Sequence, residues 1–181
     1  IINPGEKTAI VGPTGSGKTT ITNLITKFYE IDSGTILIDR KNINEFKLES
    51  LRKKIGVILQ DVFLFADTIY NNITLFNNDI SIKDVEKAAK DLEIHDFIMS
   101  LPGGYDFNVS ERGSTLSAGQ KQLIAFLRVL VNNPDILILD EATSSIDSYS
   151  EDLIKNATNK ITKGKTSIII AHRLSTVESA D

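Results

Sequence analysis

The stretch Gly12-Pro13-Thr14-Gly15-Ser16-Gly17-Lys18-Thr19 matches the pattern G-x-x-x-x-G-K-[S/T]. Its glycines let the backbone bend so that successive N–H groups point at phosphate oxygens. Lys18 is expected to place its charge on the β- and γ-phosphates, and the Thr19 hydroxyl suits Mg²⁺. Together with Thr20, the stretch predicts a nucleoside triphosphate site. The alternative interpretation is a glycine-rich turn with an incidental lysine.

A strand before this loop and a helix after it are what phosphate binding requires, because the helix N-terminus adds its dipole. Thr8–Val11 is a short apolar run, and apolar residues recur at helical spacing in Lys18–Phe28. Strands and helices alternate farther along, which predicts an α/β fold with a mostly parallel sheet. The other expected strands are Thr35–Asp39, Gly56–Leu59, Ile136–Leu139 and Ser167–Ala171, and the other expected helices are Leu48–Lys54, Ser81–Leu92, Ala118–Val131 and Ser148–Ile161.

The region from Asp67 to Pro102 differs from the rest, because its pattern predicts helix and no strand. Ser81 is expected to cap its helix, since Asp84 follows three residues later as in a capping box. We therefore expect a helical insertion in the α/β fold.

The composition excludes several classes of protein. The chain has 181 residues, of which 41% are hydrophobic and 24% charged, and this favours one folded domain over disorder. The net charge is −4 without a Lys/Arg block, which disfavours a nucleic-acid partner. The absence of Cys excludes disulfides and thiol catalysis. No apolar stretch approaches the ~20 residues of a membrane helix, and a first residue other than Met leads us to expect a fragment.

Two acids, Asp140 and Glu141, directly follow the apolar run Ile136–Leu139. A fully apolar run is typical of a strand buried on both faces, and the carboxyl ends of such strands form the ligand edge of the sheet. We expect Asp140 to hold the Mg²⁺ shell and Glu141 to polarise the attacking water. One solvated acid at a strand end is common, but two beside a phosphate loop favour the catalytic interpretation.

His172 and Gln60 also follow expected strands. A lone His or Gln at such a place is usually structural, but both are expected at the same edge as Asp140. We therefore predict that His172 contacts the γ-phosphate, and that Gln60 senses the nucleotide and contributes to the metal shell. His95 lies in no such position and is given no functional role.

The segment Leu116-Ser117-Ala118-Gly119-Gln120 resembles the signature sequence of ATP-binding cassette (ABC) ATPases, with Ala118 where Gly is more usual. The order of phosphate loop, Gln60, signature, Asp140-Glu141 and His172 matches that family along essentially the whole chain. Ser117 is also suited to cap a helix whose N–H groups face a phosphate. The resemblance implies that Ser117, Ala118, Gly119 and Gln120 bind the γ-phosphate of ATP held by a second subunit.

Other segments match the same family. Ser144-Ser145-Ile146-Asp147 resembles the D-loop that crosses the dimer interface, and Glu111-Arg112-Gly113 resembles a segment that touches the membrane part of exporters. Leu123 and Leu127 depart from the usual pattern and are interpreted as packing changes. The aromatic residue that stacks on adenine normally lies upstream of Ile1, so the choice of ATP follows from the resemblance.

The resemblance implies an ATPase of an ABC transporter, most similar to exporters, that uses ATP and Mg²⁺. We expect a phosphate-loop core in residues 1–66 and 132–181, a helical subdomain in residues 67–131 and part of an antiparallel β subdomain. The expected partners are a second nucleotide-binding domain, as homodimer or heterodimer, and transmembrane domains that hold the chain at the cytoplasmic face of a membrane.

Other classes of ATPase and nucleotide-binding protein would show sequence features that can be compared with this chain. Chromosome-type ABC ATPases place long coiled coils between phosphate loop and signature, and Lys18 to Ser117 shows no sustained heptads. A translation-type protein would carry two cassettes in one chain. A silent regulatory module would not need both Lys18 and Glu141. Small-molecule kinases and GTPases share the loop but have no need of the signature.

Overall fold

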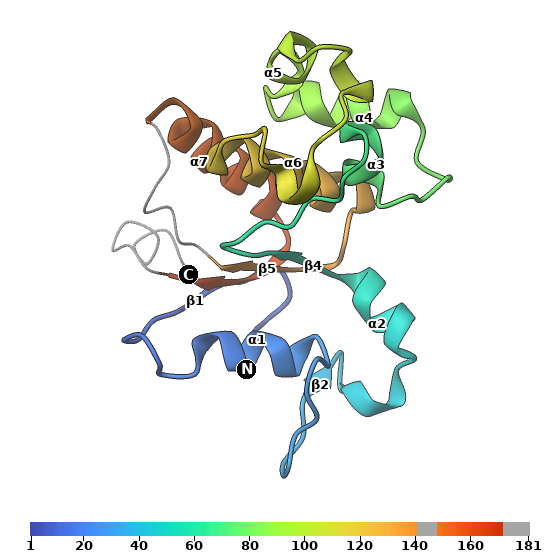
Figure 1. Cartoon of the computed structure of the whole chain (residues 1–181). Coiled ribbons are helices and arrows are strands. Elements are labelled where there is room, and N and C mark those ends of the chain that lie inside the picture. Colours follow the sequence, from blue (N-terminus) through green and yellow to red (C-terminus); the bar gives the residue numbers. More distant parts are fainter. Residues whose placement is uncertain (141–147, 172–181) are drawn as a thin grey trace. The chain divides into compact units, whose positions relative to one another are not determined.

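The computed structural model describes residues 1–140 and 148–171 (Figure 1). These residues form two compact units, each with its own packing. The sheet unit contains residues 1–57, 134–140 and 164–171, and the helical unit contains residues 58–133 and 148–163. The subdomain boundaries at 66 and 131 stay a prediction.

The main sheet of the described residues has the strand order β1-β6-β5-β4. β1 (Lys7–Ile10) pairs parallel with β6 (Thr166–Ile170), and β6 pairs parallel with β5 (Ile136–Asp140). β4 (Ile55–Ile58) completes the order. The parallel sheet predicted from the alternation of elements is thus confirmed, and neighbouring strands are far apart in sequence.

The remaining elements of the sheet unit are helices and a hairpin. A small antiparallel sheet pairs β2 (Leu37–Ile38) with β3 (Lys41–Asn42). Figure 1 shows α1 running along one face of the main sheet. The helical segments are α1 (Lys18–Ile25), η1 (Ile43–Glu45) and α2 (Leu48–Lys54).

Helical segments and strands of the sheet unit form one apolar core. Ile43 from η1, Leu51 from α2 and three strand residues, Ile55, Ile138 and Ile168, form its buried centre. The exposed fraction of each of these side chains is at most 6%. Burial of an aliphatic side chain of this size stabilises by about 1.5–3 kcal/mol relative to exposure.

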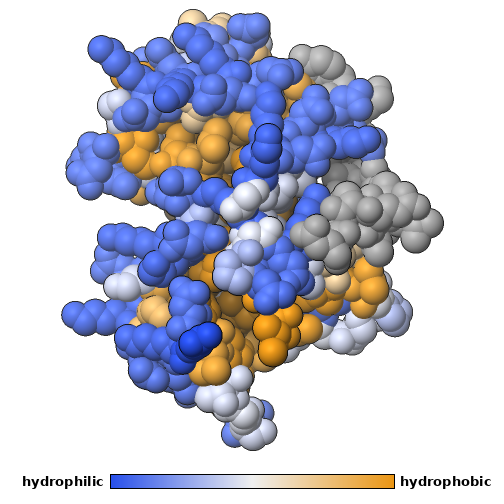
Figure 2. Space-filling view, turned by 180° about the vertical axis from the view of Figure 1, so that it is seen from behind, coloured by the Kyte–Doolittle hydropathy of each residue, from blue (hydrophilic) through white to orange (hydrophobic). Residues whose placement is uncertain are grey.

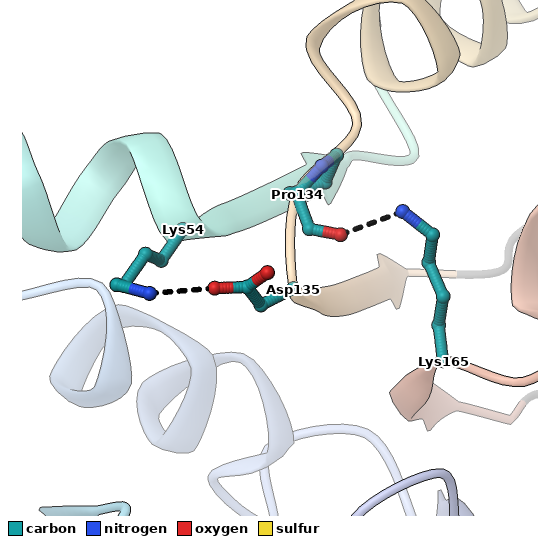
Figure 3. A network of polar contacts seen from close by, with 4 residues as sticks. All are labelled: Lys54, Pro134, Asp135 and Lys165. Atoms are coloured by element: carbon teal, nitrogen blue, oxygen red, sulfur yellow. Dashed lines mark hydrogen bonds and ion pairs between the residues drawn. The ribbon is translucent and has the colours of Figure 1, made fainter.

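Polar contacts join the beginning of β5 to its neighbours (Figure 3). The backbone N–H of Asp135 donates to the carbonyl of Lys54 at 3.0 Å, and Lys54 Nζ lies 2.6 Å from Asp135 Oδ2. Lys165 Nζ donates to the Pro134 carbonyl at 2.7 Å. The hydrogen bond and charge of Asp135 raise the pKa of Lys54. These contacts lie at the end of β5 opposite to Asp140.

The helical unit packs around α6 (Ala118–Asn132), which contacts α3 (Ile69–Thr74), α4 (Ile82–Asp91) and α7 (Ser148–Thr162). Phe126 and Leu127 of α6 and Ile73 of α3 are almost fully buried. The other helical segments are α5 (His95–Ser100), η2 (Gly104–Asp106) and η3 (Glu111–Gly113). Within the residues that the structure describes, no helix combines the length and hydrophobicity that a membrane span requires.

Most expected elements are present with ends shifted by one residue, but two predictions were too long. α1 ends at Ile25 because Lys27 adopts a left-handed conformation with φ 52°, and Phe28 N–H donates to the Asn23 carbonyl as in a Schellman motif. The strand expected at Thr35–Asp39 shortens to β2, because Asp39 has φ 50° and turns the chain.

Candidate functional site

The phosphate-loop motif connects β1 to α1, as the sequence predicts. Lys18, the first residue of α1, is only 7% exposed. Its Nζ donates to the carbonyl oxygens of Gly12 (2.7 Å) and Pro13 (3.0 Å). The ammonium group is therefore held over the loop by two neutral acceptors, and a phosphate could replace them as a stronger, charged partner.

The start of α1 offers backbone donors. Gly17 occupies the N-cap position with φ 87° and makes no side-chain cap hydrogen bond. The first bond of the helix joins Ile21 N–H to the Gly17 carbonyl at 3.1 Å, so the N–H groups of Lys18, Thr19 and Thr20 have no partner within the helix. This arrangement fits a bound anion, because the dipole of α1 adds to the charge of Lys18.

The register of the sheet brings Asp140 to the same edge as the loop. Asp140, the last residue of β5, is aligned with Ile170 of β6, and Ile170 is aligned with Ile10, the last residue of β1. The N–H of Ala171 donates to the Ile10 carbonyl at 3.1 Å, which extends this alignment one residue beyond the strands. One strand, β6, separates Asp140 from the strand that leads into the loop.

The donor set at this edge fits Mg²⁺. Thr19 is exposed and carries a hydroxyl, and Asp140 supplies a carboxylate. Among the residues that the structure describes, no three His, Asp or Glu side chains gather into a metal site. One hydroxyl and one carboxylate are a suitable protein contribution for Mg²⁺, which usually keeps water and substrate phosphate oxygens as its remaining ligands.

Several predicted site residues lie outside the described residues: Glu141, the D-loop segment Ser144–Asp147, and His172. Their sequence neighbours are placed, since Asp140 ends β5 and Ala171 directly follows β6. The roles of Glu141 and His172 stay predictions.

The signature segment forms the N-terminus of α6, as the sequence predicts. Ser117 Oγ accepts from the Gln120 N–H at 3.2 Å, and the Ser117 N–H donates to Gln120 Oε1 at 2.9 Å. This reciprocal pair is a capping box, and Ser117 and Ala118 both remain exposed. The prediction of a Ser117 cap is confirmed; its partner Gln120 could have been recognised from the spacing S-x-x-Q.

Gln60 follows β4 and belongs to the helical unit. Together with Asp61, Val62 and Phe63 it lines an open hollow of about 450 Å³, and the hollow is completed by Ala118 and Lys121 from the first turn of α6. The segment that begins at Gln60 therefore lies beside the signature helix. A metal contact of Gln60 stays a prediction.

One residue that the sequence analysis did not single out is Arg128 in the middle of α6. It is the only charged residue in the otherwise apolar run Leu123–Val131. Its guanidinium group donates to Asn72 of α3. A lone charge in an apolar helix stretch could have directed attention to it, because such a charge needs a specific acceptor. Leu123 and Leu127 are buried, as expected of packing residues.

Comparisons with known proteins agree with these features. A family model described as "ABC transporter" matches residues 1–144. A putative multidrug export ATP-binding/permease protein of Bacillus subtilis is 47% identical, and one of Staphylococcus aureus is 51% identical. Each alignment covers 99% of this chain and 31% of the relative, so the chain spans about a third of the length of these proteins.

The solved structures include one with the same fold. The structure of a bacterial Atm1-family ABC exporter with ATP bound superimposes with a TM-score of 0.90 and 45% identity, over 99% of this chain and 32% of that chain. Phosphate loop, signature helix and sheet edge thus occur here in the fold of an ABC ATPase. The chain belongs to the ABC transporter family.

Proposed function

We propose that this chain binds and hydrolyses ATP as the nucleotide-binding part of an ABC exporter. The observation that carries the proposal is the shared edge of the sheet, where β1 leads into the phosphate loop and β5 ends in Asp140. Support also comes from relatives named as export ATP-binding/permease proteins and from the ATP-bound exporter of the same fold.

Different residues bind the phosphates and the Mg²⁺ ion in this proposal. Lys18 and the N–H groups at the start of α1 bind the β- and γ-phosphates. Thr19 and Asp140, with Gln60, would hold Mg²⁺, which supplies charge neutralisation between these phosphates. Lys18 exchanges its contacts with Gly12 and Pro13 for phosphate oxygens when the nucleotide binds.

Hydrolysis then needs a base and a contact to the transferred group. The Glu141 carboxylate accepts a proton from the attacking water, the water oxygen bonds to the γ-phosphorus, and the bond to the bridging oxygen breaks to release ADP and phosphate. His172 donates a hydrogen bond to the γ-phosphate. Ser117, Ala118, Gly119 and Gln120 of a second nucleotide-binding domain complete the site, as homodimer or heterodimer.

We place the transmembrane partner against the helical unit. The exposed rings of Phe63, Phe65 and Phe76 stack edge to face, with centroids 5.2 and 6.0 Å apart in successive pairs. Figure 2 shows a face of the molecule on which hydrophobic residues are exposed among hydrophilic ones. The relatives are about three times as long and are named as ATP-binding/permease proteins, which supports a permease part as the occupant of this surface. Contacts of the Glu111-Arg112-Gly113 segment with it would hold the chain at the cytoplasmic face of a membrane.

The test is Glu141→Gln in the full-length gene product. Removal of the base should lower ATP hydrolysis roughly a hundredfold or more, while ATP binding persists because the amide keeps the shape of the side chain. Glu45→Gln, at an exposed position of η1, is the matched control and should hydrolyse ATP at the normal rate. Normal hydrolysis by Glu141→Gln together with complete loss in His172→Ala would transfer the role of base to His172.

A further inference from the structure

Arg128 has an unusual environment for a cation. It lies between buried apolar residues of α6, and burial lowers the pKa of its guanidinium group to about 10, so it is still charged at neutral pH. In the described part of the chain no carboxylate forms an ion pair with it. A desolvated charge of this kind is tolerated only where strong acceptors surround it.

The acceptors of Arg128 belong to Asn72. Arg128 Nε donates to the Asn72 carbonyl at 2.6 Å, and Nη2 donates to Asn72 Oδ1 at 3.2 Å. Asn72 is fully buried, and its Oδ1 also accepts from the Phe65 N–H at 2.8 Å. Its Nδ2 donates to the carbonyls of Phe65, Asp67 and Thr68, at 3.0, 3.3 and 3.0 Å. Asn72 therefore links α6 to the backbone of residues 65–68.

The chain just before this segment lies near α6 at a second place. Residues 60–63 line the hollow that Ala118 and Lys121 complete at the first turn of α6. Arg128 lies ten residues beyond Ala118, or about 15 Å along the helix axis. The hydrogen bonds of Arg128 to Asn72 and the approach of residues 60–63 to the first turn of α6 therefore lie far apart along the helix axis.

We propose that Arg128 is a positioning residue: through Asn72 it holds the signature helix in register with residues 60–68, so that Ser117 can meet ATP bound by a second subunit. This role rests on the proposed function. Apolar packing alone would allow the helix to rotate and slide, whereas the planar guanidinium fork accepts only one arrangement of its two acceptors.

The experiment uses the full-length gene product with Arg128→Met, which keeps the aliphatic volume and removes the fork. ADP affinity reports on the phosphate loop, and ATP retained after rapid gel filtration of a Glu141→Gln background reports on closure with the second subunit. We expect ADP affinity to stay within about twofold and retained ATP to fall about tenfold or more, within the usual range of coupling between sites. Arg128→Lys, which keeps the charge and one donor, should recover part of the loss.

Lys160→Met is the matched control. Lys160 of α7 donates to the Asp91 carbonyl and to Glu93 Oε1 in the same unit, at 2.6 and 2.8 Å, and neither partner belongs to residues 60–68 or to α6. It should retain ATP normally. Equal losses of retained ATP in Lys160→Met and Arg128→Met would show that Arg128 has only a structural role and would overturn the proposal. A loss of ADP affinity parallel to the loss of retained ATP would overturn it as well. Unchanged retention in Arg128→Met would do the same.

A second variant covers the case in which Arg128→Met does not fold. Asn72→Asp keeps both acceptors of Arg128 but loses the Nδ2 donors to residues 65–68. It should lower ATP retention while preserving ADP affinity, and normal retention overturns the proposal. Failure of the proposed function can be distinguished from failure of the Arg128 proposal, because in the first case the unmodified protein would not hydrolyse ATP at all.

Discussion

At the scale of single residues, the burial of Lys18 separates it from the exposed lysines of the chain. Its ammonium group donates to two carbonyl oxygens of the loop. The helix that follows the loop, α1, has no side-chain cap at its N-terminus. In the proposed function, a bound triphosphate would replace these neutral acceptors by anionic ones, and the resulting gain in binding energy depends on the charge of the side chain.

Lys18→Ala should therefore weaken ATP binding by about tenfold or more, because a charge-assisted hydrogen bond contributes roughly 1.5–3 kcal/mol. Equilibrium titration with ATP measures the effect. Lys83→Ala, at an exposed position of α4, is the control and should bind normally. Normal ATP affinity in Lys18→Ala would remove the loop from the proposed site.

At Gly17 the backbone conformation favours glycine, although there is space for a side chain. It has φ 87°, and a Cβ added there would meet no atom within 4 Å. Gly17→Ala should cost about 1–2 kcal/mol of stability through backbone strain. Gly164 has φ 72° and equally open surroundings, so Gly164→Ala should lower the melting temperature similarly. Only Gly17→Ala should also weaken ATP binding, and equal ATP affinities would contradict this assignment.

At the scale of elements, two helices begin with the same device. α4 starts with the Ser81–Asp84 capping box, and α6 starts with the Ser117–Gln120 box. Each serine hydroxyl accepts from an N–H group in the first turn of its helix, and the Asp84 N–H also donates to the Ser81 carbonyl at 3.1 Å. The pair offers a natural comparison, because only α6 carries the signature.

Ser117→Ala and Ser81→Ala should each lower stability by about 1 kcal/mol, the usual effect of losing a cap. Thermal denaturation of the two variants tests this. ATP hydrolysis should fall only in Ser117→Ala, because in the proposed function the Ser117 hydroxyl also contacts the γ-phosphate bound by the second subunit. A comparable loss of hydrolysis in Ser81→Ala would show that the signature effect is a consequence of helix stability.

The two boxes also differ in pH dependence. Hydrogen bonds from Ser81 lower the pKa of Asp84 below 3.8 in the folded protein. The stabilisation from Asp84 is therefore present above pH 3.8 and is lost as the pH falls through the lowered value. Hydrogen exchange of α4 should accelerate in that acid range relative to α6, whose Gln120 does not titrate. Asp84→Asn should abolish this difference. If the difference persisted, titration of Asp84 would not be its cause.

At the scale of the whole molecule, the signature helix and the phosphate loop belong to different compact units of one chain. The proposed site is completed by a second subunit, so ATP should close two domains head to tail. Ser117→Arg should prevent closure, because a cation at a helix N-terminus opposes the dipole and its bulk blocks the approach.

ATP retention in the Glu141→Gln background measures this closure. Ser117→Arg should lose retention, whereas Ser81→Arg at the other capped helix should keep it. Full retention in Ser117→Arg would mean that the signature does not act across an interface.

Local patterns were enough to predict much of the molecule. The phosphate loop, the caps Ser81 and Ser117 and the alternation of strands and helices depend on residues within a few positions of one another, so their physics is present in the sequence. Helices α3 and α5 were not predicted individually, because six residues are too few to show a helical period.

Contacts between distant segments required the folded chain. The strand order β1-β6-β5 places Asp140 near the phosphate loop, although well over a hundred residues separate them in sequence. The bond from Arg128 to Asn72 joins residues 56 positions apart. Neither partner carries a local signal for the other, because a hydrogen bond across the fold exists only once packing has excluded water and brought donor and acceptor into reach.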